Sequence, residues 1–211
     1  GLTYLYGDYL AFFSKYPLNA TASILKGTYT DPVSGESYSM SSLRPVLYTT
    51  TRFGGRTLHL FNLHLKAQGF PPGSYPDDIK KRRAQAHALE NHIKSNLNPV
   101  SDLIVILGDA NTALTNTGTQ GGDDFLEAST LGMLCLKSDN PGNTANDFIP
   151  MNVTILPADS WTHSVYTSRL DHIILSPAAY ALYRPGSIKI VPHASGDPSD
   201  HLPIQLTLDA P

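Results

Sequence analysis

Side chains of types that bind metal ions and move protons stand at the ends of four apolar segments. These segments are Leu58–Lys66, Leu103–Asn111, Ser168–Ser176 and Ser199–Leu208. Carboxylate oxygens are the ligands that Mg²⁺ prefers, and a histidine tuned by a carboxylate transfers protons near neutral pH. Together, these residue types suit metal-assisted hydrolysis of a phosphoester, which needs a metal, an activated water and a proton donor.

Strand periodicity predicts which way the polar groups of the first segment point. Alternate residues of a strand share a face, so His64 continues the face of Leu58 and Leu60. That face changes from apolar to polar along the strand, as expected where a core gives way to a site. His59 points to the opposite face, where we expect a structural role.

The second segment is a buried apolar run that ends in Gly-Asp-Ala-Asn. If the chain stays extended, Asp109 and Asn111 share a face and deliver a carboxylate and an amide to one point. The amide could donate to a phosphoryl oxygen without adding negative charge. A turn is the competing interpretation, because Gly, Asp and Asn are all common in turns.

The last two segments add two aspartates and a histidine. Asp171 begins an otherwise apolar strand, where an unpaired carboxylate would be costly to bury, and His172 lies on the other face of that strand. Arg169 could be its structural partner, and a histidine from another segment is the functional alternative. Asp200 and His201 precede the final strand, where a polar loop end is the competing interpretation.

The elements around these residues predict one domain over residues 1–211. Short apolar segments rich in β-branched and aromatic residues recur between Gly, Pro, Asn or Asp, which is typical of strands. One long helix is predicted from Asp77 to Leu97, and a shorter one around Asp123–Leu131. Many strands with few helices favour stacked sheets with helices outside, and no stretch looks like a domain linker.

Composition excludes several classes of protein. The chain is 41% hydrophobic and 16% charged, which indicates a globular protein, and no run reaches the ~20 apolar residues of a membrane-spanning helix. A net charge of −3 exerts no general pull on nucleic acid, and the one basic run, residues 80–83, is expected to be a solvated helix face. Cys135 is the only cysteine, which excludes an internal disulfide.

Two triplets beginning at Asn19 and Asn152 match the acceptor pattern for N-glycosylation, so the sequence leans weakly toward secretion and the compartment stays unknown. A signal peptide is absent, but Gly1 looks like a boundary, so this absence carries little information.

The motifs resemble those of a known family. FNLHLKA, VILGDAN, SRLDHIILS and SDHLPIQLTL occur in the order and approximate spacing of the DNase I-like endonuclease/exonuclease/phosphatase superfamily. LAFFSKYPL resembles the family's Ser-Arg-x-Pro strand, with Lys15 in place of Arg, and GDAN departs slightly from Gly-Asp-Phe-Asn. The resemblance, from about Tyr9 to Leu208, implies a mixed α/β (α+β) fold of two stacked, mainly antiparallel β-sheets flanked by helices, an αββα sandwich.

The resemblance implies a role for each catalytic candidate. His64 would be an acid or a phosphate-binding histidine. Asp109 and Asn111 would hold metal or the attacking water and stabilise the pentacovalent phosphorus. Asp171 would orient His201, which would be the general base or a donor to the transition state.

The implied metal is Mg²⁺ or Mn²⁺, held by Asp109, Asn111 and Asp200. The family's opening strand and its Glu, the main Mg²⁺ ligand, have no counterpart after Gly1. We therefore expect a domain without its N-terminal segment, whether those residues were removed from the sequence, come from a second chain or are missing from the product. Such a fragment should be weakly active or inactive alone, since carboxylate ligands dominate Mg²⁺ binding.

These inferences predict Mg²⁺-dependent phosphoester hydrolysis, first by a nuclease or phosphodiesterase. His64 favours the DNase, sphingomyelinase, inositol-phosphatase and deadenylase-like branches, so a sphingomyelinase-like or inositol-polyphosphate phosphatase-like hydrolase is an alternative. The substrate is then nucleic acid, phospholipid or inositol phosphate, with Phe70, Tyr75 and Trp161 as candidate contacts. A catalytically incomplete fragment or a non-enzymatic binding protein of the same fold is the remaining alternative.

Overall fold

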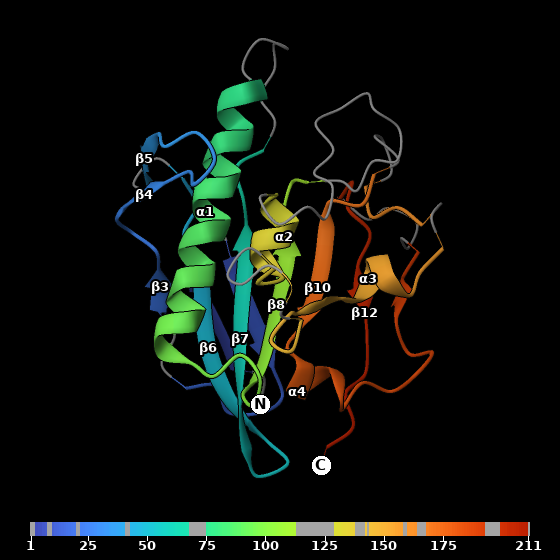
Figure 1. The fold of residues 1–211 in the computed structure, drawn as a ribbon. Helices are drawn as coiled ribbons and strands as arrows, with labels where there is room; N and C mark the ends of the chain where they lie inside the picture. Colours follow the sequence, from blue (N-terminus) through green and yellow to red (C-terminus); the bar gives the residue numbers. More distant parts are fainter. Residues whose placement is uncertain are drawn as a thin grey trace.

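Three of the candidate residues, His64, Asp109 and Asp171, lie on a six-stranded sheet in the order β3-β6-β7-β8-β10-β9 (Figure 1). The structure is a computed structural model that describes residues 3–7, 10–19, 22–40, 43–67, 75–112, 129–137, 142, 144–157, 160–163, 168–192 and 199–210. In chain order the elements are β1 (Thr3–Gly7), β2 (Leu10–Ser14), β3 (Ala22–Ile24), β4 (Thr28–Thr30), β5 (Ser37–Ser39), β6 (Val46–Phe53), β7 (Arg56–His64), α1 (Tyr75–Asn96), β8 (Leu103–Asp109), α2 (Thr130–Leu134), β9 (Ile149–Pro150), α3 (Met151–Thr154), β10 (Asp171–Leu175), α4 (Pro177–Tyr180), β11 (Lys189–Ile190) and β12 (Ile204–Gln205).

Strands β7 and β8 run parallel, whereas the other neighbours in this sheet pair antiparallel. Helix α1 follows β7 and precedes β8, and a crossover of this kind returns the chain to start a parallel neighbour. Figure 1 shows α1, in green, crossing one face of the sheet. The carboxyl ends of β7 and β8 therefore lie at the same edge, beside the start of the antiparallel strand β10.

The face under α1 carries the larger hydrophobic core. Alternate residues of β7 and β8, such as Phe61 and Ile106, are buried there against Ala86 and Leu89 of α1. This alternation follows from the strand period of two and leaves the intervening residues for the other face.

The long helix is confirmed, because α1 covers nearly all of the range predicted from Asp77 to Leu97. The shorter helix predicted around Asp123–Leu131 falls mostly outside the described residues, and α2 overlaps only its end. Within the described part of the chain, no helix is long and apolar enough to cross a membrane.

The opposite face of the sheet is covered by two small antiparallel sheets, β1–β2 and β11–β12. Leu10 and Phe12 of β2 pack with Leu47 of β6, and the dark blue strands behind the sheet in Figure 1 are β1 and β2. Ile204 of β12 packs in a cluster with Val105 of β8. Stacked β-layers with helices outside are thus confirmed, although in the described residues the second layer consists of two separate short sheets.

The basic run 80–83 on α1 is not a solvated face, and that expectation is wrong. Lys80 Nζ pairs with Glu36 Oε1 at 2.5 Å, and Arg83 donates to both carboxylate oxygens of Asp31 at 2.8 and 2.6 Å. Both acids lie in the turn between β4 and β5, which packs beside α1. The helix pattern could not reveal these partners because they come from a distant hairpin.

The two central residues of the run are also engaged. Lys81 Nζ lies 5.9 Å from the centroid of the Tyr38 ring. Arg82 is 1% exposed and donates to the Lys66 carbonyl at 3.0 Å. The run therefore ties the hairpin and the end of β7 to the helix.

The two glycosylation-type triplets differ in exposure. Asn152 is completely buried, and its Nδ2 donates to the Asp171 carbonyl at 2.9 Å. Asn19 is exposed, and its Nδ2 donates to Thr50 Oγ1 at 2.6 Å. Only the first triplet, at Asn19, presents its asparagine at the surface.

Candidate functional site

Three strand ends bring one histidine and two aspartates into a row at the edge of the sheet. His64 ends β7 and pairs in register with Asp109, the last residue of β8. Asp109 pairs in turn with Asp171, the first residue of β10. The Nε2 atom of His64 lies 3.3 Å from Oδ2 of Asp109. Sheet register therefore assembles the row from segments that are distant in sequence.

Strand alternation turns this row toward the two small sheets. Leu58 and Leu175, which share the row's face, pack in the cluster beneath those sheets. His59 and His172 point to the helix side, as predicted. His172 is buried, and its Nε2 lies 3.0 Å from the Thr112 carbonyl, as a donor would.

Asp171 has a histidine as its partner. His201 Nδ1 donates to Asp171 Oδ2 at 2.7 Å. Arg169, considered as a structural partner, donates instead to the backbone carbonyls of Asn152 and Pro157. Of the two partners left open by the sequence, the structure shows the histidine.

The backbone at the start of β10 is held from two directions. Thr162 Oγ1 accepts hydrogen bonds from the amides of Leu170 and Asp171, both at 3.0 Å. Asn152 Nδ2 donates to the Asp171 carbonyl at 2.9 Å. The Asp171 carboxylate is therefore presented from a fixed backbone.

Asn111 reaches the site through a turn, which is the competing interpretation that the sequence left open. Its φ is +49°, in the left-handed region that asparagine tolerates better than most residues. Its amide nitrogen donates to Asp109 Oδ1 at 2.7 Å, and its Nδ2 donates to Asp109 Oδ2 at 2.9 Å. Nδ2 also donates to the Leu65 carbonyl at 3.1 Å, which fixes the orientation of the side-chain amide. Asn111 thus holds Asp109.

Gly108 permits the close approach of β7 and β8 next to the site. Its φ is +124°, and a Cβ at this position would lie 2.1 Å from the Leu63 carbonyl oxygen. A larger residue would therefore push apart the two strands that carry His64 and Asp109.

Burial gives the His64–Asp109 pair unusual proton affinities. Burial, together with the nearby charges of Arg44 and His201, lowers the pKa of His64 to about 4. Burial and the negative charge of Asp171 raise the pKa of Asp109 to about 6. At neutral pH the imidazole is therefore uncharged, and its contact with Asp109 is not an ion pair.

The pKa of His201 is shifted in the opposite direction to that of His64. Burial opposes its protonation, but the hydrogen bond to Asp171 and the charge of that carboxylate outweigh it and raise the pKa of His201. The site thus has one neutral histidine and one that holds its proton more firmly.

Three groups in this site could share a cation. Ligand atoms of Asp109, Asp171 and His201 all lie within 4.8 Å of one another. The two carboxylates repel each other, as the raised pKa of Asp109 shows, and a hard divalent cation would relieve that repulsion. The donor set therefore fits Mg²⁺ or Mn²⁺.

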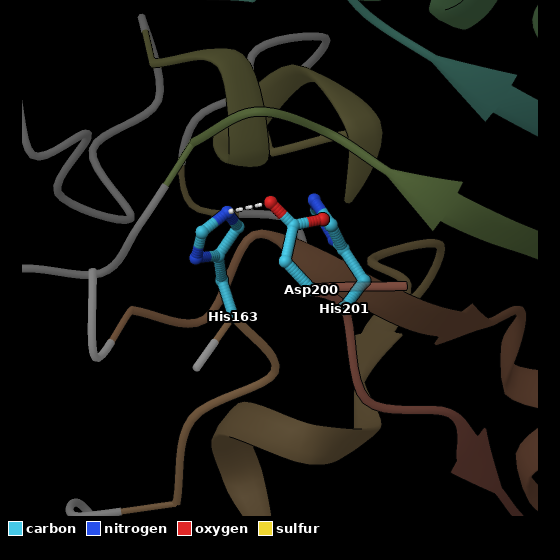
Figure 2. A group of neighbouring side chains, drawn as sticks. All are labelled: His163, Asp200 and His201. Atoms are coloured by element: carbon cyan, nitrogen blue, oxygen red, sulfur yellow. Dashed lines mark ion pairs between the residues drawn. The ribbon is translucent and has the colours of Figure 1, made fainter. Parts of the chain in front are cut away.

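Asp200 falls in a second group, shown in Figure 2 with His163 and His201. His163 Nε2 lies 3.3 Å from Asp200 Oδ2, and the rings of His163 and His201 meet edge to face at 4.7 Å. The sequence put Asp200 with Asp109 and Asn111, whereas no motif supported a role for His163. The only sequence signal for His163 was its place eight residues before Asp171.

One further charged residue acts on the site, and three aromatic residues were candidate substrate contacts. The positive charge of Arg44 acts on both His64 and Asp109, and no motif had singled it out. Trp161 is 41% exposed, two residues before His163. Phe70 and the side chain of Tyr75 lie outside the described residues.

A comparison with known proteins finds one family model that matches most of the chain. The model of a family described as "Endonuclease/Exonuclease/phosphatase family" matches residues 2–201. No curated protein matches the chain.

Solved structures with the same fold come from several bacteria and an archaeon. The Neisseria 3′ phosphatase NExo bound to a product DNA hairpin has a TM-score of 0.60 at 14% identity, over 94% of this chain and 74% of its own. An AP endonuclease from Archaeoglobus fulgidus has a TM-score of 0.60 at 15% identity, over 95% and 74%. A Staphylococcus aureus beta toxin variant with bound magnesium ions has a TM-score of 0.54 at 18% identity, over 94% and 67%. At these identities the likeness shows the DNase I-like fold alone.

Proposed function

This chain belongs to the Endonuclease/Exonuclease/phosphatase family, and from that premise we propose that it is a divalent-metal-dependent phosphodiester hydrolase, a nuclease or phosphodiesterase. Members of the family hydrolyse phosphoester bonds. The observation that carries the proposal is the row His64, Asp109 and Asp171 with His201 bonded at its end.

The two histidines have different tasks in this proposal. Asp171 orients the ring of His201 and raises its pKa. A histidine that binds its proton more tightly suits donation to a phosphoryl oxygen as negative charge develops in the transition state. His64 has a pKa of about 4 and is a poor proton store at neutral pH. A phosphate-binding role through its neutral ring therefore fits His64 better than a role as general acid.

Asp109 is the group we propose to orient the attacking water. Asn111 holds both of its carboxylate oxygens, so the carboxylate cannot rotate away from the sheet edge. When bound at Asp109 and Asp171, Mg²⁺ or Mn²⁺ would neutralise phosphoryl charge and make water more acidic. Because its side-chain hydrogens are engaged, Asn111 acts as a positioning residue in this proposal.

The test is hydrolysis of bis(p-nitrophenyl) phosphate by the purified chain with Mg²⁺, Mn²⁺ or EDTA. We expect weak but measurable metal-dependent turnover, in line with the low activity expected from the sequence, and a further fall of about 10²- to 10⁴-fold in His201→Ala and His64→Ala. His59→Gln is the matched control, because His59 lies on the same strand as His64 but faces the helix side. Full turnover in both alanine variants would refute this site.

Substrate class can be separated with plasmid DNA, RNA, sphingomyelin and inositol polyphosphates. A nuclease should cleave the nucleic acids with a rate that falls as salt rises, because phosphate contacts release counterions. No turnover on any substrate by a folded, metal-loaded chain would instead support the non-enzymatic or incomplete reading.

One observation favours the sphingomyelinase-like alternative, whose substrate headgroup carries no net charge. The basic run on α1 is engaged by Glu36, Asp31, Tyr38 and the Lys66 carbonyl, so it does not supply a cationic groove for a polyanionic substrate. Cleavage of sphingomyelin, with nucleic acids and inositol polyphosphates left intact, would select this alternative.

A further inference from the structure

A second group of metal-ligating side chains lies beside the row: His163, Asp200 and His201, here called the rim group. Their ligand atoms lie within 4.8 Å of one another, and Figure 2 shows the three side chains gathered around one space. We propose that the rim group binds one transition-metal ion of the zinc type, such as Zn²⁺ or Co²⁺, and that this binding withdraws His201 from hydrolysis.

The spacing of the donors fits such an ion. Ligands of tetrahedral zinc sit 2.0–2.2 Å from the metal, which places neighbouring ligand atoms roughly 3.4 Å apart. His163 Nε2 and Asp200 Oδ2 already lie 3.3 Å apart. A ligand nitrogen of His201 lies within 4.8 Å of both atoms.

The backbone brings the two histidines together before any ion binds. His163 and His201 are partners in an antiparallel bridge. Next to them, the Leu202 amide donates to the Thr162 carbonyl at 2.6 Å, and the His163 amide donates to the Ser168 carbonyl at 3.0 Å. Residues opposite each other across such a bridge project side chains to the same face. Two imidazoles in this position form a preorganised pair of ligands.

Asp171 fixes the His201 ring through its other nitrogen. It accepts a hydrogen bond from His201 Nδ1 at 2.7 Å, so Nε2 is the nitrogen left to bind a metal. Histidine ligands almost always donate their other ring N–H to a carboxylate or carbonyl, which fixes the tautomer and strengthens the ligand.

The donor types separate this group from the carboxylate site. Two imidazoles with one carboxylate favour Zn²⁺ and Co²⁺, whereas the carboxylates of Asp109 and Asp171 suit Mg²⁺. The His163 side chain is 5% exposed and that of Asp200 62%, so an ion can enter from the solvent side. His201 belongs to both groups. Occupation of the rim group therefore competes with the proposed use of His201 on phosphate.

The test uses Co²⁺ alone, added to the purified metal-free chain and followed by visible absorption and calorimetry. We expect one Co²⁺ per chain, displaced by Zn²⁺. Asp200→Asn and His163→Asn should each weaken binding at least tenfold. Asp200 is exposed, so its variant should fold normally even if the His163 variant does not. His87→Ala is the control, because His87 lies on α1 and its ring contacts Asn91.

Binding is measured without substrate, so its outcome does not depend on the proposed hydrolase activity. The inference is overturned if the wild-type chain binds no Co²⁺ at millimolar concentration, or if Asp200→Asn binds as tightly as wild type. It is also overturned if Asp109→Asn removes binding while the rim variants keep it. If the chain hydrolyses phosphodiesters, Zn²⁺ should inhibit wild type at saturating Mg²⁺ and inhibit Asp200→Asn at least tenfold less.

Discussion

His201 and Asp171 are joined by a hydrogen bond of 2.7 Å between Nδ1 and Oδ2, although 30 positions separate them in the chain. Arg169, the other partner that the sequence considered, donates to the backbone carbonyls of Asn152 and Pro157. The carboxylate therefore tunes a histidine while the neighbouring arginine supports the fold.

Asp171→Asn should remove the effect of the carboxylate on His201 while it leaves the contacts of Arg169 in place. We expect the pKa of His201 to fall, because the substitution removes the charge that raises it, and turnover to drop by about 10²-fold or more. The measurement is an NMR titration of the His201 ring alongside hydrolysis of bis(p-nitrophenyl) phosphate. An unchanged His201 titration would contradict the assigned coupling, whatever happens to activity.

Gly108→Ala should destabilise the sheet strongly. The new Cβ would meet the Leu63 carbonyl oxygen at 2.1 Å in addition to the strain of a φ of +124°. We expect a loss of about 2–4 kcal/mol in the free energy of unfolding, measured with urea. Gly55→Ala is the control, since Gly55 has a φ of +78° with nothing within 4 Å of the added carbon. A cost of about 1 kcal/mol is expected there. Equal costs would show that the close strand contact does not matter.

Acid should destabilise the fold before most carboxylates titrate. Burial lowers the pKa of His59, His92 and His172, so the unfolded chain binds more protons than the folded one as pH falls below about 6.5. The contribution of these three histidines to the free energy of unfolding is complete above that pH and declines below it. Urea unfolding between pH 8 and 5 measures the slope.

Two variants test the sign of this pH dependence. His59→Gln should flatten the slope, because it removes a group whose burial opposes protonation. His201→Gln should steepen it, since the raised pKa of His201 contributes stability on the acid side. Slopes that change in the reverse directions would refute the account.

The packing of the β4–β5 hairpin on α1 should depend on the buried ion pair between Asp31 and Arg83. Asp31 is 0% exposed and accepts two hydrogen bonds from Arg83, so Asp31→Ala leaves a largely buried guanidinium with less compensation. We expect a loss of about 3–5 kcal/mol. The exposed partner Glu36 offers the comparison, because solvent screens its charge and Glu36→Ala should cost much less than Asp31→Ala. Urea unfolding measures both, and a small effect at Asp31 would contradict the prediction.

The sequence predicted the parts of this site that depend on local geometry. The period of a strand is enough to place His64, Asp109 and Asp171 on one face, and the structure puts them in one row. The same rule correctly turned His59 and His172 away from the site.

The parts that depend on distant pairing were not accessible. The bridge between His163 and His201 is set by two separate loops, and no local pattern encodes it. The sequence could not decide between an extended chain and a turn at Asn111, because a single residue in the left-handed region ends the strand period. The basic run was misread because its acidic partners, Asp31 and Glu36, come from a hairpin more than forty residues earlier.

The burial of Asn152 makes its acceptor triplet and the folded site mutually exclusive. An oligosaccharide attached there during synthesis would occupy the nitrogen that holds the Asp171 carbonyl, and the sugar would have no room beneath the surface. Expression through a secretory pathway that glycosylates proteins should therefore yield two populations, with and without a sugar at Asn152. Chains modified at Asn152 would be misfolded and inactive, whereas chains from a bacterial cytoplasm would avoid this loss.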